Sequence, residues 1–364
     1  RLTIGLLVVV ATVFLSCSPK TVQTPATPLT AIPTPATPSW DNIVAEAKKE
    51  GKVTLYTFGF TGDAGAAVSK AFEATYGIKV ETVGGTGAVL IERIRSESAS
   101  GKHLADTLDS SPPLVMLAKN SALTQSAGDL PVLKEMGVWR AFSKLDAEGH
   151  ILCYVFTYYP IYYNTSLVKE AEAPRSWNDL LTPRWKGGKI ALASPLADPT
   201  LSRIYAVMTK NGVLDEGYFS KLAAQEPTIG PSAREPPMML ARGEAQLSIV
   251  AETVMSPIQA TGAPIKLVQP TEGVVSFMGV GMAIVKDAPH PNAARLFINW
   301  LLSKEGQLVA AQAKNGIPVR SDVADFSAEK VVLKKAYFST LETELEANRL
   351  IEQGVVAKIF GVQK

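Results

Sequence analysis

The sequence predicts an α/β protein built from two domains. Short apolar segments alternate with amphipathic segments of helical spacing from residue 40 onward, which is typical of mainly parallel sheets flanked by helices. The part from Trp40 to Lys364 is longer than one hydrophobic core usually serves. The alternation also starts again after a tyrosine-rich stretch near residue 160, which fits two domains.

The N-terminal segment predicts export. Arg1 is followed by an uncharged apolar run, Leu2 to Leu15, that is short for a membrane span and typical of a secretory signal. Phe14-Leu15-Ser16-Cys17 is similar to a bacterial lipobox, so we expect residues 1–16 to be a lipoprotein signal peptide and Cys17 to be lipidated. The alternative is an ordinary signal with a chance cysteine.

Residues 17–39 form a Pro/Thr-rich tether. Prolines recur every few positions and almost no residue can join a core, as expected of an extended, semi-rigid spacer. A lipid anchor, a spacer and a folded body together predict a protein held at the outer, periplasmic or cell-surface side of the cell membrane. After lipidation Cys153 would be the remaining cysteine, which excludes an intrachain disulfide.

The first half of the body predicts three strands and three helices in alternation. The helices are expected over residues 39–51, over a segment carrying Val68, Phe72 and Tyr76, and over residues 88–97. The strands are expected at residues 52–58, 78–83 and 105–111. Each strand leads into a polar loop at its carboxyl end, where open α/β sheets bind their ligands.

The second half repeats this alternation. Helices are expected near residues 176–181, 200–212, 214–225, 235–242 and 291–313, and finally over about 327–359. Strands are expected near residues 187–194, 245–250 and 274–285, with an extended crossing segment at 265–273.

The tyrosine-rich stretch, TYYPIYYNT at residues 157–165, raises the question of a metal site, because paired phenolates are good ligands for ferric iron. Pro160 cannot donate to a sheet ladder, which confines the stretch to an edge or to a crossing between sheets. Its even positions, such as Tyr158 and Tyr162, share one face and the odd ones face the other way. We therefore expect structural tyrosines, and keep Tyr159 as a candidate ligand contact.

Composition and motifs exclude several functions. The formal net charge of +2 gives no sign of nucleic-acid binding. The sequence has no P-loop, no HExxH, no CxxC and no GxSxG motif, and its three histidines are scattered, so we expect no enzyme, no cofactor and no metal.

Two segments resemble the class II solute-binding proteins of ABC importers, and within them the ferric-iron-binding branch. They are YYNTSLVKEAEAPRSWNDLLTPRWKGGKIALASP (residues 162–195) and VKDAPHPNAARLFINWLLSKEGQ (residues 285–307). The resemblance spans Trp40 to Val323 in consistent order. It implies two α/β lobes, each a mainly parallel sheet flanked by helices, joined by two crossing strands and closing on solute by a hinge motion.

Mapped onto this chain, the resemblance implies a first lobe of residues 40–150 plus 265–318 and a second of residues 151–264 plus 319–364. It also implies an importer permease and ATPase as partners. We expect a monomer that holds a small-molecule solute in the cleft between the lobes.

The ferric branch places a tyrosine pair just after the strand that here reads AQLSIV. Glu252 and Thr253 stand there instead, and one carboxylate and one hydroxyl suit a polar organic solute better than ferric iron. They are our strongest candidates for ligand contact. Ferric binding through Tyr158 and Tyr159 stays open as an alternative.

Further candidates come from loops before helices. In the first lobe they are hydroxyls and glycines at helix starts, which could hold an anion or simply cap and turn the chain: Thr61, Gly85, Thr86, Gly87, Ser110 and Ser111. In the second lobe they are Asp198, Thr200 and Arg234. Thr200 could equally cap a helix, and Arg234 could equally be a solvated surface residue.

The polarity of the ligand is not fixed by these residues. Glu252 and Asp198 would suit an ammonium group, whereas Arg234 and the helix starts would suit an acid or a phosphate. We favour a small organic or phosphorylated anion. A tethered sensory receptor that binds solute without transport is the other alternative.

Overall fold

The computed structural model describes residues 39–139, 148–314, 316–329 and 334–363. The predicted signal peptide, Cys17 and most of the tether lie outside these residues. None of the helices described is long and apolar enough to cross a membrane.

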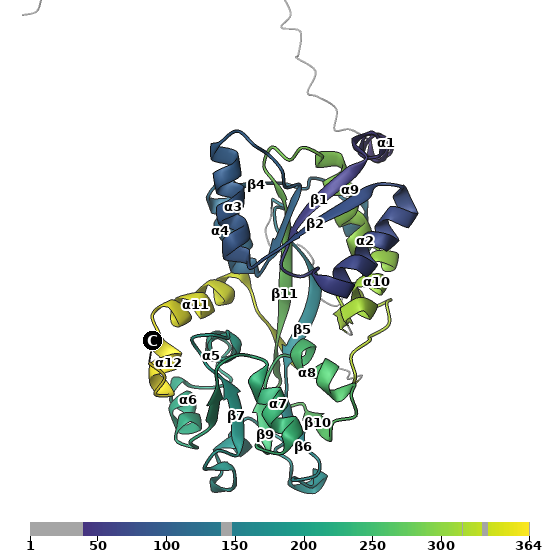
Figure 1. The fold of residues 1–364 in the computed structure, drawn as a ribbon. Coiled ribbons are helices and arrows are strands. Elements are labelled where there is room, and N and C mark those ends of the chain that lie inside the picture. Colours follow the sequence, from purple (N-terminus) through teal and green to yellow (C-terminus); the bar gives the residue numbers. More distant parts are fainter. Residues whose placement is uncertain (1–38, 140–147, 315, 330–333, 364) are drawn as a thin grey trace, which may run out of the picture. The chain divides into compact units, whose positions relative to one another are not determined.

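The first sheet combines parallel and antiparallel strands (Figure 1). Parallel pairing joins β1 (Lys52–Thr57) to its neighbours β2 (Lys79–Gly84) and β3 (Thr107–Ser110). The long strand β11 (Val274–Val285) runs antiparallel between β3 and β5 (Leu152–Tyr159). Three short strands complete the sheet. β4 (Thr124–Gln125) and β13 (Ala336–Phe338) pair with β11, and β12 (Ile317–Pro318) pairs with β5.

The second sheet has five strands within the described residues. Their order is β10 (Ile265–Val268), β6 (Ile161–Asn164), β9 (Leu247–Ile249), β7 (Ile190–Ala193) and β8 (Thr228–Gly230). β7 is parallel to both of its neighbours, whereas β6 is antiparallel to both of its own.

The chain passes between the sheets at two points. Pro160 separates β5 in the first sheet from β6 in the second, at a position where no N–H donor is needed. Residues 269–273 lead back from β10 to β11. Both points lie within the crossing segments named from the sequence, while the lobe boundaries at residues 150 and 265 stay predictions.

Helices connect most strands of the first sheet. They are α1 (Trp40–Glu50), α2 (Gly62–Tyr76), α3 (Gly87–Ala99), α4 (Pro112–Asn120), α9 (Pro291–Leu302) and α10 (Lys304–Lys314). Ser39 caps α1 by accepting from the Asn42 N–H at 3.4 Å, and Gly51 ends it with φ 71°. The single helix predicted for residues 291–313 is broken at Ser303, whose extended ψ of 168° interrupts it between α9 and α10.

The second sheet is flanked by α5 (Thr200–Lys210), α6 (Glu216–Ala223), α7 (Glu235–Arg242) and α8 (Glu252–Gln259). The helix expected near residues 176–181 is only a 3-10 turn, Asn178–Leu181, because Pro183 stops it. In the segment expected to be helical from residue 327, the described residues before 341 are not helical. Helix α11 (Leu341–Glu352) begins after a capping box formed by Thr340 and Thr343, and α12 (Val355–Ile359) follows.

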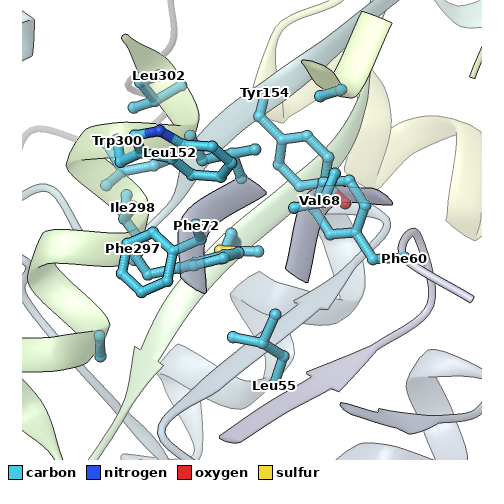
Figure 2. Packing of buried hydrophobic residues seen from close by; sticks show 14 of the residues in the cluster. Leu55, Phe60, Val68, Phe72, Leu152, Tyr154, Phe297, Ile298, Trp300 and Leu302 are labelled. Carbon is cyan, nitrogen blue, oxygen red and sulfur yellow. The ribbon is translucent and has the colours of Figure 1, made fainter. Parts of the chain in front are cut away.

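The core of the first sheet combines aliphatic side chains with a smaller group of packed aromatic rings (Figure 2). Phe72 packs edge-on against Phe297 with ring centroids 5.1 Å apart, and Phe60 stacks on Tyr154 at 4.7 Å. A separate core beneath the second sheet includes Trp177, Trp185 and Phe219. The two largest hydrophobic clusters of the described residues therefore lie one at each sheet, and the division into two domains stays a prediction.

Candidate ligand-binding site

A cavity of about 630 Å³ is lined by strands β5, β11 and β12 of the first sheet and by residues at or near the starts of helices α5 and α8, which flank the second sheet. Strands β5 and β11, which pair across its floor, contribute Thr157, Tyr159 and Phe277. A volume of this size accommodates a small organic solute.

Arg203 is the buried cation of this cavity. It lies on α5, is 5% exposed, and forms a bidentate pair with the Glu344 carboxylate of α11 through Nε at 2.7 Å and Nη2 at 2.8 Å. Its Nη1 donates to the Tyr159 hydroxyl at 2.6 Å, and its guanidinium lies 4.0 Å from the centre of the Phe277 ring. Burial opposes the charge, but Glu344 and Tyr159 more than offset this and raise the pKa of Arg203.

The loop before α2 is held by a buried carboxylate. Asp109 at the end of β3 accepts from the Phe58 and Gly59 N–H groups at 2.6 and 2.9 Å and from the Thr57 and Tyr154 hydroxyls at 2.8 Å. Burial raises the pKa of Asp109, and these donors partly offset the rise. This loop leads into α2, and Ala64 in the first turn of that helix lines the cavity.

Two more helix starts reach the cavity. Asp198 accepts from the Thr200 N–H at 2.9 Å at the start of α5 and leaves its half-buried carboxylate at the cavity wall. Thr253, in the first turn of α8, lies against Thr157 of β5, with both its N–H and its hydroxyl 3.4 Å from the Thr157 hydroxyl.

Four residues named from the sequence line the cavity: Ser111, Tyr159, Asp198 and Thr253. The other eight do not. Thr61, Thr86 and Arg234 are exposed at helix starts, and Gly85 is half-buried beside Thr86. Ser110 is buried against Gly87, where an added Cβ would lie 1.8 Å from the serine hydroxyl. Whether any of these residues binds ligand stays a prediction.

Glu252 and Thr200 are placed differently from our expectation. Both side chains are buried, 1% and 3% exposed, and neither lines the cavity. The neighbours Ala251 and Thr253 do line it, so the Glu252 side chain leaves the start of α8 on another side.

The four tyrosines of the stretch at residues 157–165 are all buried, at 0–2% exposure. Only Tyr159 among them lines the cavity. Adjacent strand residues face opposite ways, so Tyr158 and Tyr159 cannot hold the same ion. Burial raises the pKa of Tyr158 and of Tyr159, which opposes the phenolate form. The described residues also contain no cluster of three or more acidic, histidine or cysteine side chains suited to a metal.

Sequence reasoning missed Arg203, Phe277 and the contribution of α11. Arg203 lies one turn before Val207 on the buried face of α5, and a charge on an apolar stripe does indicate a buried partner. That partner, Glu344, is 141 positions away, and nothing in the sequence identifies it.

Comparison with known proteins agrees with this architecture. Residues 67–338 match the family of bacterial extracellular solute-binding proteins, so the chain belongs to that family. A periplasmic protein of Salmonella typhimurium, whose name assigns it provisionally to 2-aminoethylphosphonate binding, is 30% identical over 268 residues, covering 70% of this chain and 73% of that protein.

Solved structures show the same fold. Iron-bound HitA from Pseudomonas aeruginosa has a TM-score of 0.67 at 21% identity, covering 85% of this chain and 99% of its own. AfuA from Actinobacillus pleuropneumoniae, with fructose-6-phosphate bound, has a TM-score of 0.65 at 22% identity, covering 84% and 97%. The predicted two-lobed α/β fold and family are confirmed: the chain is an extracytoplasmic solute-binding protein of an ABC importer.

Proposed function

We propose that the solute is an organic phosphonate or phosphate monoester that carries an amino group. The observation that supports this most directly is the meeting, in one cavity, of Arg203 from α5 and the first turn of α2. The first amides of a helix have no acceptor within the helix and favour an anion. A guanidinium matches the oxygen geometry of phosphate-like groups.

Arg203 has donors left for such a ligand. Its hydrogen bonds within the described residues use one N–H on each nitrogen. A guanidinium has five N–H donors, so a second N–H remains on Nη1 and on Nη2. The hydroxyls of Ser111, Thr157 and Thr253 supply further hydrogen-bonding groups around the same space.

Asp198 supports the amino group. Its carboxylate lies at the cavity wall. The positive charge of Arg203 is already balanced by Glu344, so the Asp198 carboxylate can pair with an ammonium group of the ligand. A zwitterionic ligand with an ammonium near Asp198 and its phosphorus oxygens near Arg203 complements both. The name of the Salmonella relative fits both groups of such a ligand, and the sugar phosphate in AfuA fits its phosphorus group.

Calorimetry with 2-aminoethylphosphonate, ethylphosphonate and ferric ion tests the proposal. Arg203→Gln combined with Glu344→Gln keeps the buried charges balanced and should weaken binding of both phosphonates at least about tenfold, the effect of one lost charged hydrogen bond. Arg95→Gln, which changes an exposed arginine of α3 outside the cavity lining, is the matched control and should bind like the parent.

Asp198→Asn should weaken only the ligand with the amino group. Phosphonate binding that is insensitive to Arg203, or a stoichiometric visible absorption band on adding ferric ion to the parent, would overturn the proposal. The second result would restore iron as the solute.

We also propose that the protein binds without catalysis and is anchored through lipidated Cys17. The apolar run that ends Leu15-Ser16-Cys17, followed by the Pro/Thr-rich tether, supports the anchor. Cys17→Ala should release the protein from membranes or leave its signal uncleaved, as fractionation and mass spectrometry of the N-terminus would show. Normal processing with unchanged membrane retention would contradict lipidation.

A further inference from the structure

Four buried side chains beside the start of α8 carry oxygen atoms without hydrogen-bond partners among the described residues. They are Tyr158, Tyr162, Ser248 and Glu252, each 0–1% exposed. Their hydroxyls and both Glu252 oxygens make five of the nine buried side-chain N or O atoms that lack a partner in that part of the chain. Native proteins rarely leave such atoms unpartnered, and a concentration of them indicates a bound water or ion.

The fold brings these side chains to one place. Tyr162 on β6 lies directly opposite Ser248 on β9, so their side chains share a face of the second sheet. Tyr162 also packs with Val250 and Met255, residues that flank Glu252 along the chain. Thr253 contacts Thr157, and Glu252 and Tyr158 are the residues next to these two along the chain.

The electrostatics agree with this arrangement. After burial itself, the Glu252 carboxylate is the main cause of the raised pKa of Tyr158 and of Tyr162. Burial raises the pKa of Glu252 to about 8, Asp325 adds to the rise, and the Ser256 hydroxyl one turn along α8 opposes it. Two further acidic groups after β12 also raise the tyrosine pKa values: Asp325 acts on Tyr158, and Glu329 acts on both tyrosines.

We propose that Glu252, Tyr158, Tyr162 and Ser248 form a site for a monovalent alkali cation, separate from the solute cavity. All the unpartnered atoms are hard oxygens, the ligands that alkali and alkaline-earth cations take. The site neither shares residues with the cavity lining nor depends on the identity of the solute.

The charge count favours a monovalent cation over a divalent one. Glu252 is the one carboxylate of the set, and the other members are neutral hydroxyls. Asp325 and Glu329 are already engaged, Asp325 by the Ser327 N–H at 2.8 Å and Glu329 by the Gln259 amide and the Leu267 N–H at 3.0 Å. Calcium sites recruit more carboxylate oxygens than this arrangement offers.

Thermal unfolding of the solute-free protein tests the site. In buffers of equal ionic strength, replacing choline chloride by sodium or potassium chloride should raise the melting temperature by about 2 °C or more. Because a cation displaces the Glu252 proton, binding near pH 7 should also release up to one proton, seen with a pH indicator dye in weak buffer.

Two variants and one control complete the test. Glu252→Gln and the double variant Tyr158→Phe/Tyr162→Phe should remove the alkali-ion effect and the proton release. Thr107→Val, which removes another unpartnered buried hydroxyl, should keep both. A parent melting temperature equal in choline, sodium and potassium, or a response to calcium alone, would overturn the proposal and leave buried water as the explanation of the unpartnered atoms.

Discussion

Arg203 and Glu344 form the one salt bridge described here in which both side chains are nearly inaccessible, at 6% and 4% exposure. Buried pairs contribute little net stability relative to apolar residues, but removing one member leaves the other charge unpaired in the interior. The pair holds Arg203 in contact with Tyr159 and Phe277 at the cavity floor. The pair therefore positions the Arg203 guanidinium at the cavity as much as it stabilises the fold.

Two glutamates on α11 allow this to be measured. Glu344→Gln should lower the free energy of unfolding by about 3–5 kcal/mol, because it leaves the Arg203 charge uncompensated. Glu342→Gln breaks the exposed pair with Lys210 and should cost at most about 1 kcal/mol. Urea unfolding followed by circular dichroism gives both values. Equal effects of the two substitutions would mean that Arg203 finds solvent or another partner.

At the scale of elements, the sequence predicts helices and strands well where periodicity and caps agree. Strand β11 and helix α5 match their expected segments closely. The misses have local physical causes: Pro183 limits the 176–181 segment to a 3-10 turn, and Ser303 divides the expected long helix. Neither Pro183 nor Ser303 changes the spacing of the apolar residues, so this spacing predicted a longer helix at both places.

The site was less predictable than the fold because its members meet only through tertiary structure. Loops after strands did identify Ser111, Asp198 and Thr253 as cavity residues. The direction of the Glu252 side chain was not predictable, because it depends on how the start of α8 rests on β5. Asp109 shows the same limit, since its four donors come from two segments of the chain, residues 57–59 and Tyr154, that are far from each other in the sequence.

At the scale of the whole molecule, the solute cavity is lined by strands of the first sheet and by helices α5 and α8 beside the second sheet, and two short segments, at Pro160 and at residues 269–273, carry the chain between the two sheets. A solute that contacts Arg203 on one side and the start of α2 on the other gains contacts only when the two sides approach. Such a ligand shifts the population toward a closed state in proportion to its difference in affinity for the two states.

Small-angle X-ray scattering should detect this closure. Saturating 2-aminoethylphosphonate should reduce the radius of gyration of the parent and of Arg95→Gln, and should leave that of the Arg203→Gln/Glu344→Gln protein unchanged at the same concentration. The comparison separates closure from binding, because calorimetry on the same samples reports occupancy independently. If the parent binds the ligand stoichiometrically while its scattering profile stays constant, the two sheets are already fixed at their bound separation. The hinge motion implied by the family would then not operate in this chain.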